Sequence, residues 1–170
     1  YDFPIIKQRS YGNLGIAYKA AKDYNLAITY LQQALLTEDA DVSQKNRVIY
    51  LSNLGHVYAL INNFDKAFKN LNTSIKIADS IQVSKELQEA LYYRALSYEK
   101  AGNMEKAIKD FKRSGVIKDS LFSIEKAKQI NELQTIYETE KKEAEISLQK
   151  EEIKTLNEKV KVDKLTKGLY

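Results

Sequence analysis

The sequence predicts an all-α protein in which three antiparallel helix pairs are followed by one long helix. The first observation is a period of 40 residues, shared by three tyrosines and three alanines: Tyr18, Tyr58 and Tyr98, and Ala27, Ala67 and Ala107. A fixed period in this range is typical of stacked helix pairs. The second observation is that the 170 residues include one proline and six glycines, so few residues interrupt helices.

The composition is that of a globular helical protein and argues against several classes of site. Hydrophobic residues make up 44% of the chain and charged residues 29%. There is no cysteine, which excludes disulfides and thiolate metal sites. No apolar run approaches the roughly 18 residues of a membrane span, and no secretory signal pattern is present. The net charge of +4 comes from residues 1–120, where the excess of basic residues is scattered through the repeats and not clustered, so nucleic-acid binding is not expected.

Each 40-residue repeat predicts two helices joined by a short polar turn. The first helices share a bulky residue, a small residue and a tyrosine: Tyr11/Leu14/Gly15/Tyr18, Leu51/Leu54/Gly55/Tyr58 and Leu91/Ala95/Tyr98. The second helices share an alanine, a large apolar residue and another small residue: Ala27/Leu31/Ala34, Ala67/Leu71/Ser74 and Ala107/Phe111/Ser114. The spacing of three or four residues places each set on one helical face. The small residues are expected where two helices cross.

The turns are predicted at residues 22–25, 62–63 and 102–103. The third repeat departs from the pattern at Arg94, where the first two repeats have leucine. Two interpretations are open. Either the Arg94 side chain extends past its apolar neighbours to solvent, or the third repeat packs more loosely.

These residues resemble the tetratricopeptide-repeat motif, which pairs such a first helix with an alanine-containing second helix. The resemblance implies a right-handed superhelix over residues 1–118, with repeats at about 8–41, 48–81 and 88–118. The period exceeds the family's usual ~34 residues, and the terminal proline of the motif is absent. We therefore expect both helices of each repeat to be about one turn longer than usual.

The resemblance also implies a groove for a peptide or protein ligand, lined by the first helix of each repeat. The candidate groove residues are Arg9, Asn13, Ile16, Lys19, Ser52, Asn53, His56, Tyr92, Tyr93, Leu96 and Glu99. Asn13 and Asn53 are the strongest pair, because an amide both donates and accepts and can bind a peptide backbone. Alternatively, the two amides only stabilise neighbouring helical turns. Members of the family that bind a C-terminal carboxylate do so with lysines, arginine and asparagines in this groove. Only Asn53 of this sequence matches that set, so binding of a C-terminal carboxylate is not expected.

Residues 119–170 predict a separate long helix, the seventh of the chain, that begins after Asp119 and Ser120. From residue 121 to residue 167 there is no glycine or proline, and glutamate and lysine are frequent. Its apolar residues follow no single heptad frame, which predicts a weak coiled coil or one that can change register. We expect a weak homodimer through this helix. The residues expected to pair two copies are Ile146, Ile153, Leu156, Val160 and Leu165.

Residues 118–122 and 132–143 resemble the stretch that follows the repeats in bacterial tetratricopeptide sensor proteins. This second resemblance implies a sensor region on the extracytoplasmic, periplasmic face of the bacterial inner membrane. It also implies a membrane span just after residue 170 and an output domain such as a histidine kinase. Since the only methionine is Met104, we interpret the sequence as part of a longer protein. The alternative is a soluble scaffold that assembles partner proteins.

The sequence contains no recognisable catalytic constellation. His56 is the only histidine, so serine–histidine–aspartate and histidine-rich metal sites lack the residues they need. No glycine-rich segment follows a strand, as a phosphate-binding loop would. We therefore expect a chain that is not an enzyme and that binds no metal and no cofactor.

Overall fold

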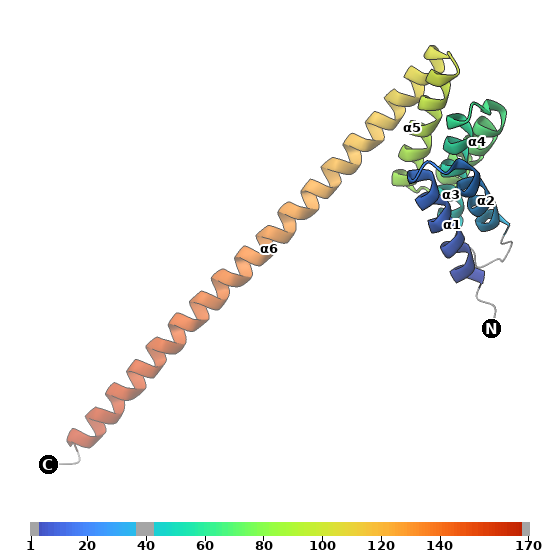
Figure 1. Ribbon diagram of the computed structural model, residues 1–170. Helices are drawn as coiled ribbons and strands as arrows, with labels where there is room; N and C mark the ends of the chain where they lie inside the picture. Colours follow the sequence, from blue (N-terminus) through green and yellow to red (C-terminus); the bar gives the residue numbers. More distant parts are fainter. Residues whose placement is uncertain (1–3, 37–42, 168–170) are drawn as a thin grey trace. The chain divides into compact units, whose positions relative to one another are not determined.

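The computed structural model describes residues 4–36 and 43–167, which form six α-helices and no strand (Figure 1). The helices are α1 (Pro4–Ala20), α2 (Tyr24–Leu35), α3 (Gln44–Leu60), α4 (Phe64–Ser80), α5 (Ser84–Lys100) and α6 (Met104–Lys167). Helices α1 and α2, α3 and α4, and α5 and the first part of α6 form the three pairs. The all-α class predicted from the 40-residue period is confirmed.

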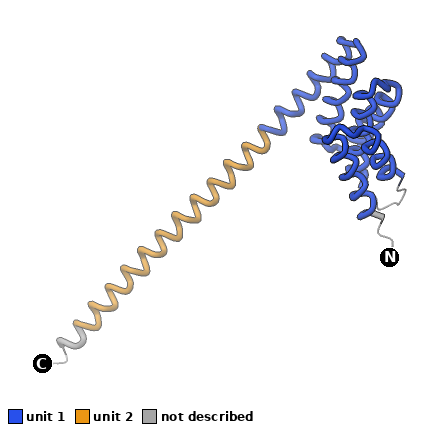
Figure 2. The backbone as a smooth tube through the Cα atoms, viewed as in Figure 1, with its two compact units in different colours: residues 1–122 blue, residues 123–170 orange. Residues whose placement is uncertain are grey.

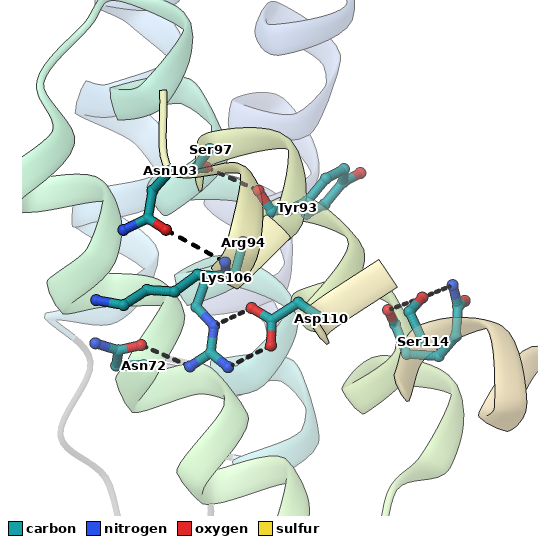
Figure 3. A network of polar contacts seen from close by, with 9 residues as sticks. Asn72, Tyr93, Arg94, Ser97, Asn103, Lys106, Asp110 and Ser114 are labelled. Carbon is teal, nitrogen blue, oxygen red and sulfur yellow. Dashed lines mark hydrogen bonds and ion pairs between the residues drawn. The ribbon is translucent and has the colours of Figure 1, made fainter. Parts of the chain in front are cut away.

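The two helices of each pair are joined by the same kind of turn. Each turn contains a residue with positive φ, namely Lys22 (62°), Asn62 (62°) and Gly102 (79°). The next residue caps the second helix, since its side chain accepts a hydrogen bond from the backbone N–H three positions later. These bonds measure 3.1 Å at Asp23, 3.3 Å at Asn63 and 3.2 Å at Asn103, the last of which is visible in Figure 3. Aspartate and asparagine are favoured at this position. The turns predicted at residues 62–63 and 102–103 are confirmed, whereas the one predicted at 22–25 is shorter, because α2 already begins at Tyr24.

Small residues allow the two helices of a pair to approach closely. A Cβ atom added to Gly15 would lie 2.6 Å from Cγ of Leu31 and 2.9 Å from its backbone nitrogen. One added to Gly55 would lie 3.0 Å from the backbone oxygen of Ala67. Because backbone atoms cannot rotate away, these positions exclude larger side chains. The three alanines that define the period are fully buried on the facing helices, as expected for helix crossings.

In the third pair an ion pair occupies the place of a leucine. Nε and Nη2 of Arg94 donate to the two carboxylate oxygens of Asp110 in α6 at 2.6 and 2.8 Å, and Nη1 donates to Asn72 of α4 at 2.7 Å (Figure 3). Asp110 is only 5% exposed. Burial alone would lower the pKa of Arg94, but the hydrogen bonds and charge of Asp110 raise it overall. Arg94 therefore joins α4, α5 and α6 instead of extending to solvent.

The helix boundary expected at residues 119–120 is wrong. Helix α6 runs without interruption from Met104 to Lys167, so the second helix of the third repeat and the long helix are one element. The described residues thus form six helices where the sequence predicted seven. Aspartate and serine cost only about 0.5–0.7 kcal/mol each in a helix, and no proline or glycine lies between Gly115 and Lys167 to stop it.

The chain divides into two compact units, unit 1 (residues 1–122) and unit 2 (residues 123–170), which are coloured separately in Figure 2. Unit 1 contains the three helix pairs. In unit 2 every side chain described, as far as Val162, is exposed. Ile146, Ile153, Leu156 and Val160 are each at least 50% exposed. Leu165, the fifth residue of the predicted pairing face, lies outside the residues whose side chains are described.

Candidate functional site

The first helices of the three repeats are neighbours, since α3 contacts both α1 and α5. We call the surface formed by these three helices the first-helix surface. At its centre lies a group of polar side chains, the Lys19 cluster, to which every repeat contributes. It consists of Lys19 from α1, Asn53 and His56 from α3, and Glu89 and Tyr93 from α5.

Lys19 connects the three repeats. Its ammonium group donates to Oδ1 of Asn53 at 2.5 Å and to the hydroxyl of Tyr93 at 3.1 Å. The same nitrogen lies 4.7 Å from the centroid of the Tyr93 ring, within the range of a cation–π contact. Burial lowers the pKa of Lys19, while the negative charge of Glu89 partly opposes that shift. Lys19 is thus a half-buried cation held by side chains from two other helices.

Tyr93 links Lys19 to the rest of the cluster. Its hydroxyl donates to Oε1 of Glu89 at 2.8 Å, and its ring stacks on the imidazole of His56 with centroids 4.2 Å apart. Burial raises the pKa of Tyr93, and the hydrogen bond to Glu89 and its negative charge raise it further. Tyr93 therefore remains a neutral donor. Nδ1 of His56 is buried without a hydrogen-bond partner in the described part of the chain.

His56 is neutral at physiological pH. Burial lowers its pKa to about 4, and the positive charges of Lys19 and Lys100 contribute to the shift. An ordinary histidine titrates near 6.5. An uncharged ring between two lysines can stack on Tyr93 without adding a third positive charge to the surface.

We expect the C2 proton of His56 to keep a constant chemical shift in NMR spectra from neutral pH to about pH 5, because its pKa is about 4. In the unfolded chain the imidazole of His56 takes up a proton near pH 6.5, so the unfolded chain binds more protons than the folded chain at mildly acidic pH. The free energy of unfolding should therefore fall as the pH drops from about 6.5 towards 4. His56→Gln should reduce this dependence. A midpoint near 6.5 in the folded protein would contradict the burial of the ring.

The two asparagines that are equivalent in the sequence differ in their surroundings. Asn53 is 3% exposed; its Oδ1 accepts from Lys19, and its Nδ2 donates to the backbone oxygen of Ile49 at 2.8 Å. Asn13 is exposed on α1. Both functional groups of the Asn53 amide are therefore used within the protein, whereas Asn13 is accessible to a ligand.

The remaining candidates lie in different environments. Arg9 and Glu99 are exposed, and Ile16 and Leu96 are half-buried, with Ile16 packed against the core. Ser52 does not reach the Lys19 cluster.

Ser52 and Tyr92 instead contact second helices of the repeats. The Ser52 side chain is buried, its hydroxyl donates to the backbone oxygen of Val48 at 2.6 Å, and it lies 3.4 Å from the hydroxyl of Ser74 in α4. The Tyr92 ring meets Phe111 of α6 edge-on, with centroids 5.7 Å apart.

One residue next to the cluster was not among the candidates. Nζ of Lys100 donates to the backbone oxygens of Ala59 at 3.2 Å and Leu60 at 2.7 Å. These carbonyls end α3, where the last backbone acceptors have no partner within the helix. Because Lys100 lies in the last turn of α5, its position in the sequence suggests an interaction with the end of its own helix. Only the stacking of α5 on α3 brings it to the end of another helix.

The described residues contain no group of three or more histidine, aspartate or glutamate side chains arranged to hold a metal ion. None of the helices in this part of the chain combines the length and the apolar character of a membrane span.

Comparison with known families identifies the repeats. One family model, described as tetratricopeptide repeat, matches residues 8–80, and a second with the same description matches residues 89–114. The two matches include parts of all three helix pairs. Comparison with curated proteins gave no match. Tetratricopeptide repeats are interaction modules, typically non-catalytic, that bind other proteins. The stacked helix pairs, the small residues at their crossings and the two matches show that the chain belongs to the tetratricopeptide-repeat family.

Proposed function

We propose that this chain is the non-catalytic sensor region of a membrane-bound bacterial signalling protein of the two-component type. The first-helix surface binds a peptide or a protein segment. The long helix pairs with a second copy and transmits the signal. The observation that supports binding is the Lys19 cluster, which joins side chains from all three repeats on one surface.

The Lys19 cluster offers a ligand both a charge and an aromatic face. The ammonium group of Lys19 has three N–H donors, and two of them are used by Asn53 and Tyr93. The third can donate to a carbonyl or carboxylate oxygen of a bound segment. Exposed Asn13 lies two turns earlier on the same helix and can bind the ligand backbone. Both contacts belong to α1, so a ligand that reaches both runs along the first helix of the first repeat.

A library of short random peptides selected on the wild-type chain provides the probe for this surface. We expect Lys19→Ala to weaken binding of the selected peptides by about ten- to hundredfold, because it removes a hydrogen bond from a charged donor. Asn13→Ala combined with Asn53→Ala should also weaken binding while helicity, measured by circular dichroism, is retained. Lys7→Ala is the matched control, since Lys7 is an exposed lysine of α1 outside the cluster. Peptides that bind all variants equally would rule out the first-helix surface.

The apolar side chains of unit 2 support the pairing of two long helices. Ile146, Ile153 and Val160 recur every seven residues, and Leu156 lies between them, as in a coiled-coil seam. All four are at least half exposed in unit 2. Burying them gains about 25 cal/mol per Å² of apolar surface, against the entropic cost of association. Because the seam is short, the dimer is weak, and anchoring of the parent protein in a membrane would raise its effective concentration.

Sedimentation of the wild-type chain over a concentration series tests this pairing. We expect the double change Ile153→Asp/Leu156→Asp to abolish the concentration-dependent dimer, because it places charges in the apolar seam. Lys150→Ala, a change on the same helix outside the seam, should leave it unchanged. A wild-type chain that sediments as a monomer at every concentration would contradict this part of the proposal.

The membrane context is supported by the resemblance of residues 118–122 and 132–143 to sensor proteins, and it has a direct test. The parent gene should encode a membrane span and an output domain, such as a histidine kinase, after residue 170. A stop codon there would instead support the scaffold function. Such a protein would use the same binding surface without transmitting a signal across a membrane.

A further inference from the structure

Unit 2 carries a second line of apolar side chains besides the seam of Ile146, Ile153, Leu156 and Val160. Its members follow one another at spacings of three, four or seven residues, as on one face of a helix. Each large side chain among them is more than half exposed, and the one alanine is exposed as well. We call this set the stripe: Ile130, Leu133, Tyr137, Ala144 and Leu148.

The stripe and the seam lie on nearly opposite sides of the helix. Unit 2 belongs to one uninterrupted α-helix (Figure 2). Each residue of a helix is turned by about 100° from the one before, which places the centre of the stripe about 150° round the axis from the centre of the seam. Supercoiling shifts a face by only about 20° per heptad. Two paired copies can therefore bury the seam or the stripe, but not both.

A gap in the stripe makes it the weaker of the two surfaces. Glu140 lies three residues after Tyr137 and four before Ala144, so it occupies the stripe position between them. Five side chains with a carboxylate among them bury far less than the roughly 1,200–2,000 Å² of a stable interface. The stripe can therefore hold only a partner that other contacts already keep close.

A second copy of this chain is the partner that fits these conditions. Between residues 123 and 162 eight lysines face nine glutamates, so two copies of this segment do not repel each other through net charge. In a parallel pair, Ile136 lies beside Lys141 of the second copy, and Glu143 lies beside Leu148, so the flanks bring no like charges together. Anchoring in one membrane would keep two copies close and parallel.

We propose that the stripe is a second pairing surface for another copy of this chain, used in alternation with the seam. Each pairing leaves the other surface exposed, so a condition that favours one disfavours the other. The inference rests on the proposed function, in which two long helices pair. It concerns different residues, however, so seam pairing and stripe pairing can fail separately.

Sedimentation of the chain with Ile153→Asp/Leu156→Asp isolates the stripe, because its seam is disrupted. Adding Glu140→Leu closes the gap in the stripe and should restore a concentration-dependent dimer, with a dissociation constant lowered by about tenfold or more. A further change, Leu133→Asp, should abolish that dimer. All of these residues except Glu140 are large apolar side chains exposed in unit 2, and Glu140 is exposed too, so the variants should keep the fold of unit 1.

Glu138→Leu in the same background is the matched control, because residue 138 lies about 110° round the helix from the stripe. It should leave the chain monomeric. A chain that stays monomeric with Glu140→Leu would overturn the proposal, and so would a control that dimerises equally well. A wild-type chain that never dimerises contradicts the seam and not the stripe, since this background has no seam.

Disulfide trapping tests the stripe with Glu140 in place. The chain has no cysteine, so an introduced one reports without background. In a parallel pair held through the stripe, residue 144 meets its counterpart, and Ala144→Cys keeps the position small and apolar. Under mild oxidation at high protein concentration it should form covalent dimers about tenfold faster than Glu145→Cys, because pairing raises the effective concentration of facing thiols. Equal rates would mean random encounters and would overturn the proposal.

Discussion

Replacing Asp110 with alanine is expected to lower the free energy of unfolding of unit 1 by about 3 kcal/mol, because it leaves Arg94 without its counter-charge. The Asp110 side chain is 7% exposed and that of Arg94 is 19% exposed, so water can replace the lost carboxylate only in part. The remaining exposure of Arg94 puts the effect at the lower end of the range for a broken buried pair. Urea denaturation followed by circular dichroism measures it.

The double change Arg94→Leu/Asp110→Ala separates the effect of a stranded charge from the value of the pair. It restores the leucine that the first two repeats have at this position. A buried ion pair replaced by apolar side chains often leaves stability unchanged or increased. We therefore expect the double variant to be more stable than Asp110→Ala alone. An equal loss in the two variants would contradict the stranded charge as the cause, since only Asp110→Ala leaves Arg94 without its counter-charge.

Replacing Ala67 with leucine is expected to destabilise unit 1 by roughly 1–3 kcal/mol through overpacking. Ala67 is fully buried, and its backbone lies so close to Gly55 that a Cβ on the glycine would be 3.0 Å from the Ala67 oxygen. Three further carbon atoms at this crossing must push α3 and α4 apart. Chemical denaturation of both proteins gives the difference in free energy.

Lys150→Ala is the control for this change, because Lys150 is exposed in unit 2. Its effect on stability should stay below about 0.5 kcal/mol, as is usual for surface substitutions. Equal losses of stability in Ala67→Leu and Lys150→Ala would contradict the close approach of the two helices.

Local features repeated along the chain were predictable from the sequence. The turns at Lys22, Asn62 and Gly102 follow from residues that accept positive φ or cap a helix. The small residues at Gly15 and Gly55 follow from the space that two crossing helices leave. These preferences act within a few residues or recur at a fixed period. The fold class and the turns could therefore be predicted from the sequence.

The partners of individual side chains were decided only by the tertiary structure. Lys19 meets Tyr93, which is 74 residues away, and this contact depends on how three repeats stack. The same stacking buries Asn53 and leaves Asn13 exposed, although the two occupy equivalent positions in the sequence. Arg94 finds Asp110 only because α6 packs beside α5. The continuity of α6 through Asp119 and Ser120 is a related case, since two weak helix formers do not stop a helix without a competing turn. In each case the outcome depends on which neighbours supply burial and hydrogen bonds, and those neighbours come from other repeats.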